Sequence, residues 1–321
     1  MYPQISLDQI KTISVSNRKS KVTSGEFAKV FSPEEDSFGD FIESLPDILS
    51  ARDLRTIASS IIRDRHAGFP CIWMIGAHVL KTGNAPIIID LLERGVITAL
   101  AMNSAAAIHD VETALFGVTS EDVAENLADG TFGMSKETGD FINDTLTLFY
   151  QKEKCGYAEA LGMRLISDDA PHAGFSVLAS CVRLKIPVSV HAAIGTDIVH
   201  QHPSMNGAAT GEMSFRDFKV FCASVKDLLR GGAVLNIGSA VILPEVFLKA
   251  LTVVRNLGYD ANGFLTANFD MIQHYRPRVN VVQRPTMNGG QGFQITGHHE
   301  IMLPLLAAML KWYGTGQKNP T

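Results

Sequence analysis

The chain has 321 residues, of which 46% are hydrophobic and 19% charged, and its formal net charge is −5 at pH 7. This length fits one large α/β domain or two domains of a globular protein. The negative charge argues against nucleic acid as a partner, and neither a membrane span of roughly 18 apolar residues nor a basic-then-apolar leader is visible. The four cysteines form no C-x-x-C pair, which favours reduced thiols in a cytoplasmic protein.

The N-terminal region differs in character from the rest of the chain. We expect residues 1–40 to form a polar arm and residues 41–321 to form a single α/β domain of nucleotide-binding type. A helix is expected over 50–66, with Ser50 as its N-cap and Gly68 just beyond its end. No internal repeat or low-complexity segment is visible.

The stretch 71–115 has the pattern of a βαβ unit. Cys71–Ile75 and 96–101 are short apolar runs, as expected of strands buried on both faces. Between them apolar residues recur at helical spacing until Gly95 ends the helix. Because βαβ units build parallel sheets, we predict a Rossmann-like, doubly wound parallel sheet with helical elaborations. Ligands of such sheets bind at the carboxyl ends of the strands.

The same alternation continues along the chain. A long helical block is expected over 120–185, broken near Gly130 and Gly133. Further strands are expected at Val188–His191, Ala233–Ile237 and 279–282, and further helices at 214–230 (with Ser214 as N-cap), 243–256 and 299–312.

Histidines gather in the loops that are expected to follow strands, namely 76–83, 103–110, 191–202, 236–240 and 284–299. Seven of the ten histidines fall there: His78, His109, His191, His200, His202, His298 and His299. Histidine carries protons near neutral pH and is a common metal ligand, so the group favours a functional cleft. The alternative is that several of them bond the loop backbone.

Small residues in these loops provide a second argument. They are Gly76, Gly83, residues 104–107 and residues 238–240. Helices expected from 108 and 242 would point backbone N–H groups into the cleft, which suits a phosphate or another anion. The alternative is tight packing between strand and helix. Neither a G-x-G-x-x-G fingerprint nor a Walker A loop is present.

Metal and serine-nucleophile sites have weaker support in the sequence. His200 and His202 could face one side of an extended segment, and Asp197 or Glu300 could add oxygen ligands. However, no recognised zinc spacing, H-E-x-x-H motif or G-x-S-x-G elbow occurs. We therefore expect no bound metal, and a metal-assisted hydrolase using the loop histidines stays as an alternative.

In order and spacing, roughly 50–312 resembles the deoxyhypusine synthase family. The loop 76–83 resembles that family's Thr-Ser-Asn-x-x-Ser-Ser-Gly loop, 103–110 its Thr-Thr-Ala-Gly-Gly-Ile-Glu-Glu segment, and 237–241 its Gly-Gly-Gly-Val turn. Asp197 and His202 lie near its Gly-Asp-Met-x-x-x-His stretch, and the last helix resembles its closing helix. The resemblance implies a Rossmann-like sheet, NAD across the strand ends, and a homotetramer with sites between paired subunits. It also implies NAD-dependent oxidation of spermidine and transfer of an aminobutyl group through an active-site lysine.

The departures from this family point to altered chemistry. No Trp-Gly-Lys segment occurs, and no lysine lies between Lys249 and Lys311, where the resemblance would place the imine-forming lysine. The family's Gly-Gly-Gly-Val-x-Lys-His-His becomes Gly-Ser-Ala-Val-Ile-Leu-Pro-Glu, which removes a catalytic histidine. Its acidic polyamine-binding run is replaced by a segment that begins with Arg284, which favours an anionic or neutral ligand.

The leading hypothesis is therefore a deoxyhypusine-synthase-like enzyme, a transferase or oxidoreductase, that binds NAD or another nucleotide without lysine-imine aminobutyl transfer. The alternative to it, besides the hydrolase, is a non-catalytic ligand-binding or assembly protein. The cofactor is expected on Gly76, His78, Thr82, Gly83, Ser104, Ala105, Asp110, Gly238 and Ser239. Proton transfer is expected from His202, Asp197, His298 or His299, and substrate contacts from Arg284 and His200.

Overall fold

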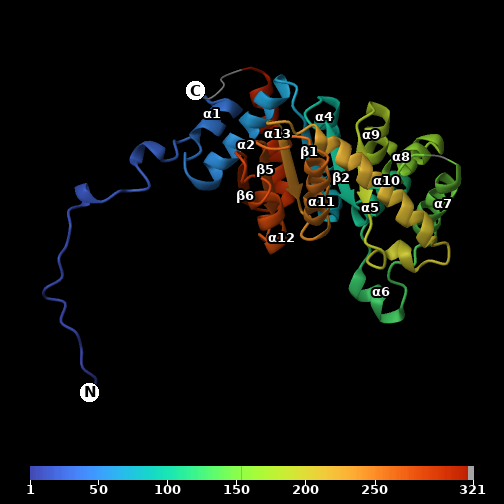
Figure 1. Ribbon diagram of the computed structural model, residues 1–321, viewed down its shortest axis with the longest axis horizontal. Coiled ribbons are helices and arrows are strands. Elements are labelled where there is room, and N and C mark those ends of the chain that lie inside the picture. Colours follow the sequence, from blue (N-terminus) through green and yellow to red (C-terminus); the bar gives the residue numbers. More distant parts are fainter. Residues whose placement is uncertain (153, 317–321) are drawn as a thin grey trace. The chain divides into compact units, whose positions relative to one another are not determined.

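The computed structural model describes residues 1–152 and 154–316 (Figure 1). The chain divides into two compact units, an N-terminal unit of Met1–Arg52 and a sheet unit of Asp53–Thr321. The expected division into a 1–40 arm and a 41–321 domain stays a prediction.

The N-terminal unit has only short elements before the start of α2 (Leu49–His66). They are η1 (Val15–Asn17), η2 (Ser24–Glu26) and α1 (Phe38–Ser44). Ser37 and Asp40 start α1 with a capping box, in which the Asp40 carboxylate accepts the Ser37 N–H at 2.9 Å and Ser37 Oγ accepts the Asp40 N–H at 3.3 Å.

The sheet unit contains a sheet of six parallel strands in the order β3-β2-β1-β4-β5-β6. The strands are β1 (Cys71–Ile75), β2 (Ala99–Asn103), β3 (Val188–His191), β4 (Ala233–Ile237), β5 (Leu265–Asp270) and β6 (Gln291–Thr296). This order is that of the Rossmann fold, so the predicted fold class is confirmed.

Helices cover both faces of the sheet (Figure 1). On one face, Phe221 and Phe247 pack on Ile72 and Met74 of β1. On the other side α13 contacts α4 and β5. The helices are α3 (Ala77–Lys81), α4 (Ala85–Glu93), α5 (Ser104–Phe116), α6 (Val123–Asp129), α7 (Lys136–Lys152), α8 (Tyr157–Ser167), α9 (Val177–Leu184), α10 (Gly207–Lys226), α11 (Ile242–Asn256), α12 (Tyr275–Pro277) and α13 (His299–Gly314), with short turns η3 (Ala173–Phe175), η4 (Ile198–Gln201) and η5 (Arg278–Gln283).

Several expected elements need correction. The run 279–282 is part of η5, a π-helical turn, while β5 and β6 lie in segments where no strand was expected. The strand predicted at 96–101 lies at Ala99–Asn103. Helix α10 begins seven residues before Ser214 because Asn206 caps it, and Ser214 Oγ instead accepts the Ala192 N–H. In the part of the chain that is described, no helix has the length and apolar character needed to cross a membrane.

Candidate functional site

The carboxyl ends of β1 and β4 form the switch point of the sheet, where the strand order reverses. Open α/β sheets bind their ligands in the crevice at this point. Ile75 pairs with Ile237, and the Gly76 N–H continues the ladder by donating to the Ile237 carbonyl oxygen at 2.8 Å. The loops 76–83 and 238–240, both expected to bind a cofactor, therefore lie side by side.

The glycines at the switch point are required by packing. A Cβ on Gly76 would collide with the Gly238 carbonyl oxygen, and one on Gly238 would lie 2.9 Å from the His299 ring. Gly238 also has a φ of +68°, which favours glycine. Tight packing, the alternative explanation for small residues here, therefore accounts for both positions. Gly83 differs, since nothing lies within 4 Å of the Cβ it would carry.

His299 is a buried polar side chain of this edge, with an exposed fraction of 1%. It begins α13, and its Nε2 lies 3.3 Å from the Phe269 carbonyl oxygen, to which it donates. Its ring centroid is 5.8 Å from that of His78. Burial lowers the pKa of His299, so the neutral ring predominates near pH 7. Its Nδ1 is then an acceptor, and it has no hydrogen-bond partner among the described residues.

His298 lies outside this arrangement. Its side chain is 64% exposed, and its Nδ1 is 3.8 Å from Glu300 Oε1. The two adjacent histidines thus separate into one buried and one exposed ring.

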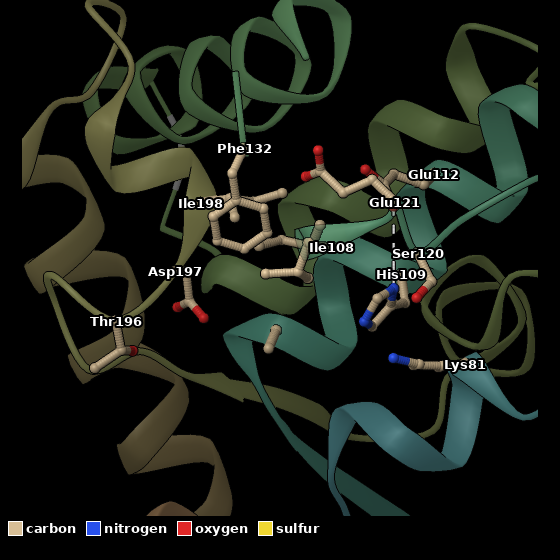
Figure 2. Close-up of a pocket in the computed structure, with 12 residues that line it drawn as sticks. Lys81, Ile108, His109, Glu112, Ser120, Glu121, Phe132, Thr196, Asp197 and Ile198 are labelled. Carbon is tan, nitrogen blue, oxygen red and sulfur yellow. Dashed lines mark ion pairs between the residues drawn. The ribbon is translucent and has the colours of Figure 1, made fainter. Parts of the chain in front are cut away.

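A second part of the edge, beyond β2 and β3, borders a cavity of about 200 Å³ that is open to solvent on one side (Figure 2). It lies between α3, α5, the start of α6 and the loop before η4. Its lining consists of Lys81, Ala105, Ile108, His109, Glu112, Ser120, Glu121, Val123, Phe132, Thr196, Asp197 and Ile198. Asp197 and Ala105 were expected site residues, whereas Glu112 and Glu121 were not singled out in the sequence.

Asp197 connects the loop before η4 to the start of α5, and both of these segments border the cavity. It accepts a hydrogen bond from Ser104 Oγ, and its Oδ2 lies 3.9 Å from His200 Nδ1. Burial raises the pKa of Asp197, and the Ser104 hydroxyl and His200 oppose the rise. His200 Nδ1 accepts the N–H groups of Gly195 and Asp197 at 3.1 and 3.2 Å, so His200 holds the loop in place.

Two further expected site residues make structural contacts. His202 Nε2 lies 2.7 Å from the Gly133 carbonyl oxygen. Both carboxylate oxygens of Asp110 accept hydrogen bonds from the start of α9. Ser176 Oγ donates at 2.6 Å and the Val177 N–H at 2.7 Å. Burial raises the pKa of Asp110 to about 6, and these bonds oppose the rise. Asp110 therefore caps α9 and does not face the cavity.

Thr82 and Ser239 also bond within their own loops. Thr82 Oγ1 donates to the His78 carbonyl oxygen at 2.8 Å. Ser239 Oγ accepts the Leu243 N–H at 3.2 Å, in the first turn of α11.

Arg284 lies at the other edge of the sheet. It precedes β6, and Gln291 at the start of β6 pairs with Leu265 at the start of β5. Its guanidinium donates to Asn280 Oδ1 at 2.8 Å. The expected role of Arg284 at the carboxyl edge depended on a strand at 279–282, which does not exist.

No group of three or more His, Cys, Asp or Glu side chains is arranged to hold a metal ion within residues 1–152 and 154–316. His200 and His202 bond different loops, as described above. The metal-assisted hydrolase therefore has no ligand set in this part of the chain.

Neither a protein-family model nor a curated protein matches the chain. Among solved structures, a provisionally named LOR/SDH protein from Methanococcus maripaludis S2 matches with a TM-score of 0.52 and 18% identity, over 81% of this chain and 69% of that one. The ternary complex of AgrE with ornithine and NAD+ matches with a TM-score of 0.52 and 15% identity, over 82% of this chain. The chain spans only 33% of the length of AgrE.

A provisionally named deoxyhypusine synthase from Entamoeba histolytica matches over 88% of this chain and 96% of that one, at 11% identity. Its TM-score of 0.48 is too low to carry an argument. The two matches with a TM-score of 0.52 show a shared fold, and membership of the deoxyhypusine synthase family stays a proposal.

Proposed function

We propose that the sheet unit is an enzyme domain that binds NAD or a related nucleotide along the carboxyl edge of its sheet. The observation that carries the proposal is the parallel strand order β3-β2-β1-β4-β5-β6, whose switch point lies at Gly76 and Gly238. Dinucleotides bind across this point in Rossmann folds. The AgrE complex, which contains NAD+, supports the proposal through its fold alone.

The residues at the switch point fit such a ligand in one specific respect. His299 presents a buried Nδ1 acceptor with no partner among the described residues, and a dinucleotide carries matching donors in its carboxamide and ribose hydroxyl groups. We propose that His78, Gly238 and His299 bound the nicotinamide half, and that Gly83, Ser104 and Ala105 bound the phosphate side. Helix α5 begins at Ser104, so its N-terminal N–H groups suit a phosphate.

NAD, when bound, supplies a hydride acceptor. The chain's own residues would orient the reacting molecule and move protons, with Asp197 and the histidines of this edge as candidates. We propose either an oxidoreductase or a transferase, in keeping with the resemblance to deoxyhypusine synthase.

Aminobutyl transfer through a lysine imine is not part of the proposal. Lys249 pairs with Glu245, and Lys311 lies 2.9 Å from Asp90, so neither lysine flanking the lysine-free segment contributes to the cavity. Incubation with spermidine, NAD+ and borohydride is expected to leave the intact mass unchanged. A trapped aminobutyl adduct would contradict this part of the proposal.

Isothermal titration calorimetry with NAD+, NADH and ADP-ribose tests nucleotide binding. We expect binding to the wild type, and at least about tenfold weaker binding to Ala105→Asp, which places a negative charge in the first turn of α5. Ala124→Asp, the same change in the first turn of the exposed helix α6, is the matched control and should bind normally. Absence of heat with all three nucleotides at millimolar concentration would overturn the proposal. Binding without any turnover would instead favour the non-catalytic alternative.

A further inference from the structure

His109, Thr119 and Glu112 form a hydrogen-bonded chain in the wall of the cavity. His109 Nδ1 lies 2.6 Å from Thr119 Oγ1, and Thr119 Oγ1 lies 2.5 Å from Glu112 Oε2. The other carboxylate oxygen, Oε1, accepts from Thr138 Oγ1 at 3.1 Å. His109 and Glu112 are three residues apart in α5, so they lie on one face of the helix.

The chemistry of these groups fixes where the protons are. An ionised carboxylate only accepts hydrogen bonds, so the single hydroxyl proton of Thr119 points to Glu112. The Thr119 oxygen is then left to accept a bond from His109. Nδ1 of His109 therefore carries the ring proton, and Nε2 has a free lone pair.

Nε2 of His109 faces the cavity. In Figure 2 this second ring nitrogen points away from Glu112, towards the side of the cavity bounded by Lys81 and Asp197. Burial lowers the pKa of His109. The nearby Glu112 carboxylate opposes the fall, while Lys81 and His78 add to it. The neutral ring is therefore the main form near pH 7 and can accept a proton.

We propose that His109 is the proton acceptor of this cavity, for a small molecule that presents a hydroxyl or ammonium group to Nε2. The O–H or N–H bond breaks, the electron pair stays on oxygen or nitrogen, and the proton passes to Nε2. The resulting imidazolium keeps its Nδ1 bond to Thr119, and Glu112, 4.0 Å from Nδ1, offsets its positive charge. Thr119 and Glu112 are positioning residues, which fix the tautomer and the direction of the ring.

This inference deepens the proposed function, since it supplies that enzyme with a base, but its tests contain no nucleotide. Failure of NAD binding and failure of the His109 proposal are therefore distinguishable.

Nitrogen-15 NMR of the histidine side chains tests the tautomer. In the wild type at pH 7.5 we expect the Nδ1–H form of His109 to exceed the Nε2–H form by roughly ten to one, since one hydrogen bond selects it. Thr119→Val should abolish this preference and lower the pKa of His109, and Thr119→Ser should restore both. Thr131→Val removes an exposed hydroxyl elsewhere and should change neither. A dominant Nε2–H form in the wild type, or an unchanged ring in Thr119→Val, would overturn the proposal.

Diethyl pyrocarbonate tests whether Nε2 is accessible as a free base. It acylates neutral imidazole, so we expect modification of His109, at a rate that rises with pH through its pKa, and no modification of the buried His191. The exposed His298 is the positive control in the same sample. A His109 that stays unmodified while His298 reacts would contradict the assignment.

Discussion

Asp217 has a carboxyl group that is buried in the sheet unit, and it serves the fold rather than the cavity. Its Oδ2 accepts the Ala158 N–H at 2.9 Å and the Val190 N–H at 2.6 Å, which ties α10 to α8 and β3. Burial raises the pKa of Asp217 to about 8, because desolvation outweighs these bonds. The side chain therefore links stability to pH.

Asp217→Asn should make the free energy of unfolding less dependent on pH. The folded-state pKa lies above the ordinary aspartate value of about 3.9, so the stability due to this proton is complete below about pH 4. It is lost as pH rises towards 8, at up to about 1.4 kcal/mol per pH unit. Urea unfolding from pH 5 to 8 measures the slope, with the exposed Asp168→Asn as control. Identical slopes for wild type and Asp217→Asn would contradict this assignment.

Gly76→Ala should destabilise the sheet unit by roughly 1–3 kcal/mol, because the new Cβ collides with the Gly238 backbone. Gly211→Ala is the matched control: it lies within α10 with nothing within 4 Å of its Cβ, so alanine should stabilise the fold by about 0.5–1 kcal/mol. Chemical denaturation measures both. A neutral Gly76→Ala would mean that the switch point has room that the structure does not show.

At the residue scale, the sequence indicated that the functional side chains lie at the carboxyl edge of the sheet. It did not indicate the role of each side chain. The phase of helix α5 decides which of the two neighbours, His109 or Asp110, lies in the cavity wall. His109 faces the cavity, whereas Asp110 faces α9. The Thr119 contact could not be foreseen because Thr119 lies in a loop beyond the helix. The i, i+3 spacing of His109 and Glu112 was the one available signal.

At the scale of elements, α5 supplies four of the twelve residues that line the cavity, and its start is defined by Asn103. The Asn103 side chain accepts the Ala106 N–H at 3.0 Å and caps the helix. Asn103→Ala should therefore lower the free energy of unfolding by about 1 kcal/mol, whereas Asn103→Ser keeps a capping oxygen and should lose much less. Equal losses in the two variants, measured by thermal or urea unfolding, would show that the cap contributes nothing.

The sequence predicted four of the six strands because each is a short, apolar, buried run. It missed β5 because polar side chains interrupt the apolar pattern. Asn268 is buried there, and its Oδ1 accepts from Asn236 Nδ2 at 2.7 Å, a contact that only the folded sheet creates. Conversely, the valine-rich run at 279–282 resembles a strand but forms η5. The periodicity of such a short run does not distinguish a strand from a helical turn.

At the scale of the whole molecule, we predict a homo-oligomer, a dimer at least and a tetramer by the family resemblance. The charged fraction is only 19%, which fits burial of surface between subunits. Size-exclusion chromatography with light scattering measures the mass directly. A monomer at micromolar concentration would contradict the prediction.

The central claim is that a nucleotide binds along the carboxyl edge of the sheet, across its switch point. The most direct measurement is the map of backbone amide shifts in nitrogen-15-labelled protein as NAD+ is added to millimolar concentration. We predict that the largest changes fall in 76–83, 104–106, 238–240 and at His299. Unchanged spectra, or changes confined to the opposite edge near Arg284 and Gln291, would contradict the claim.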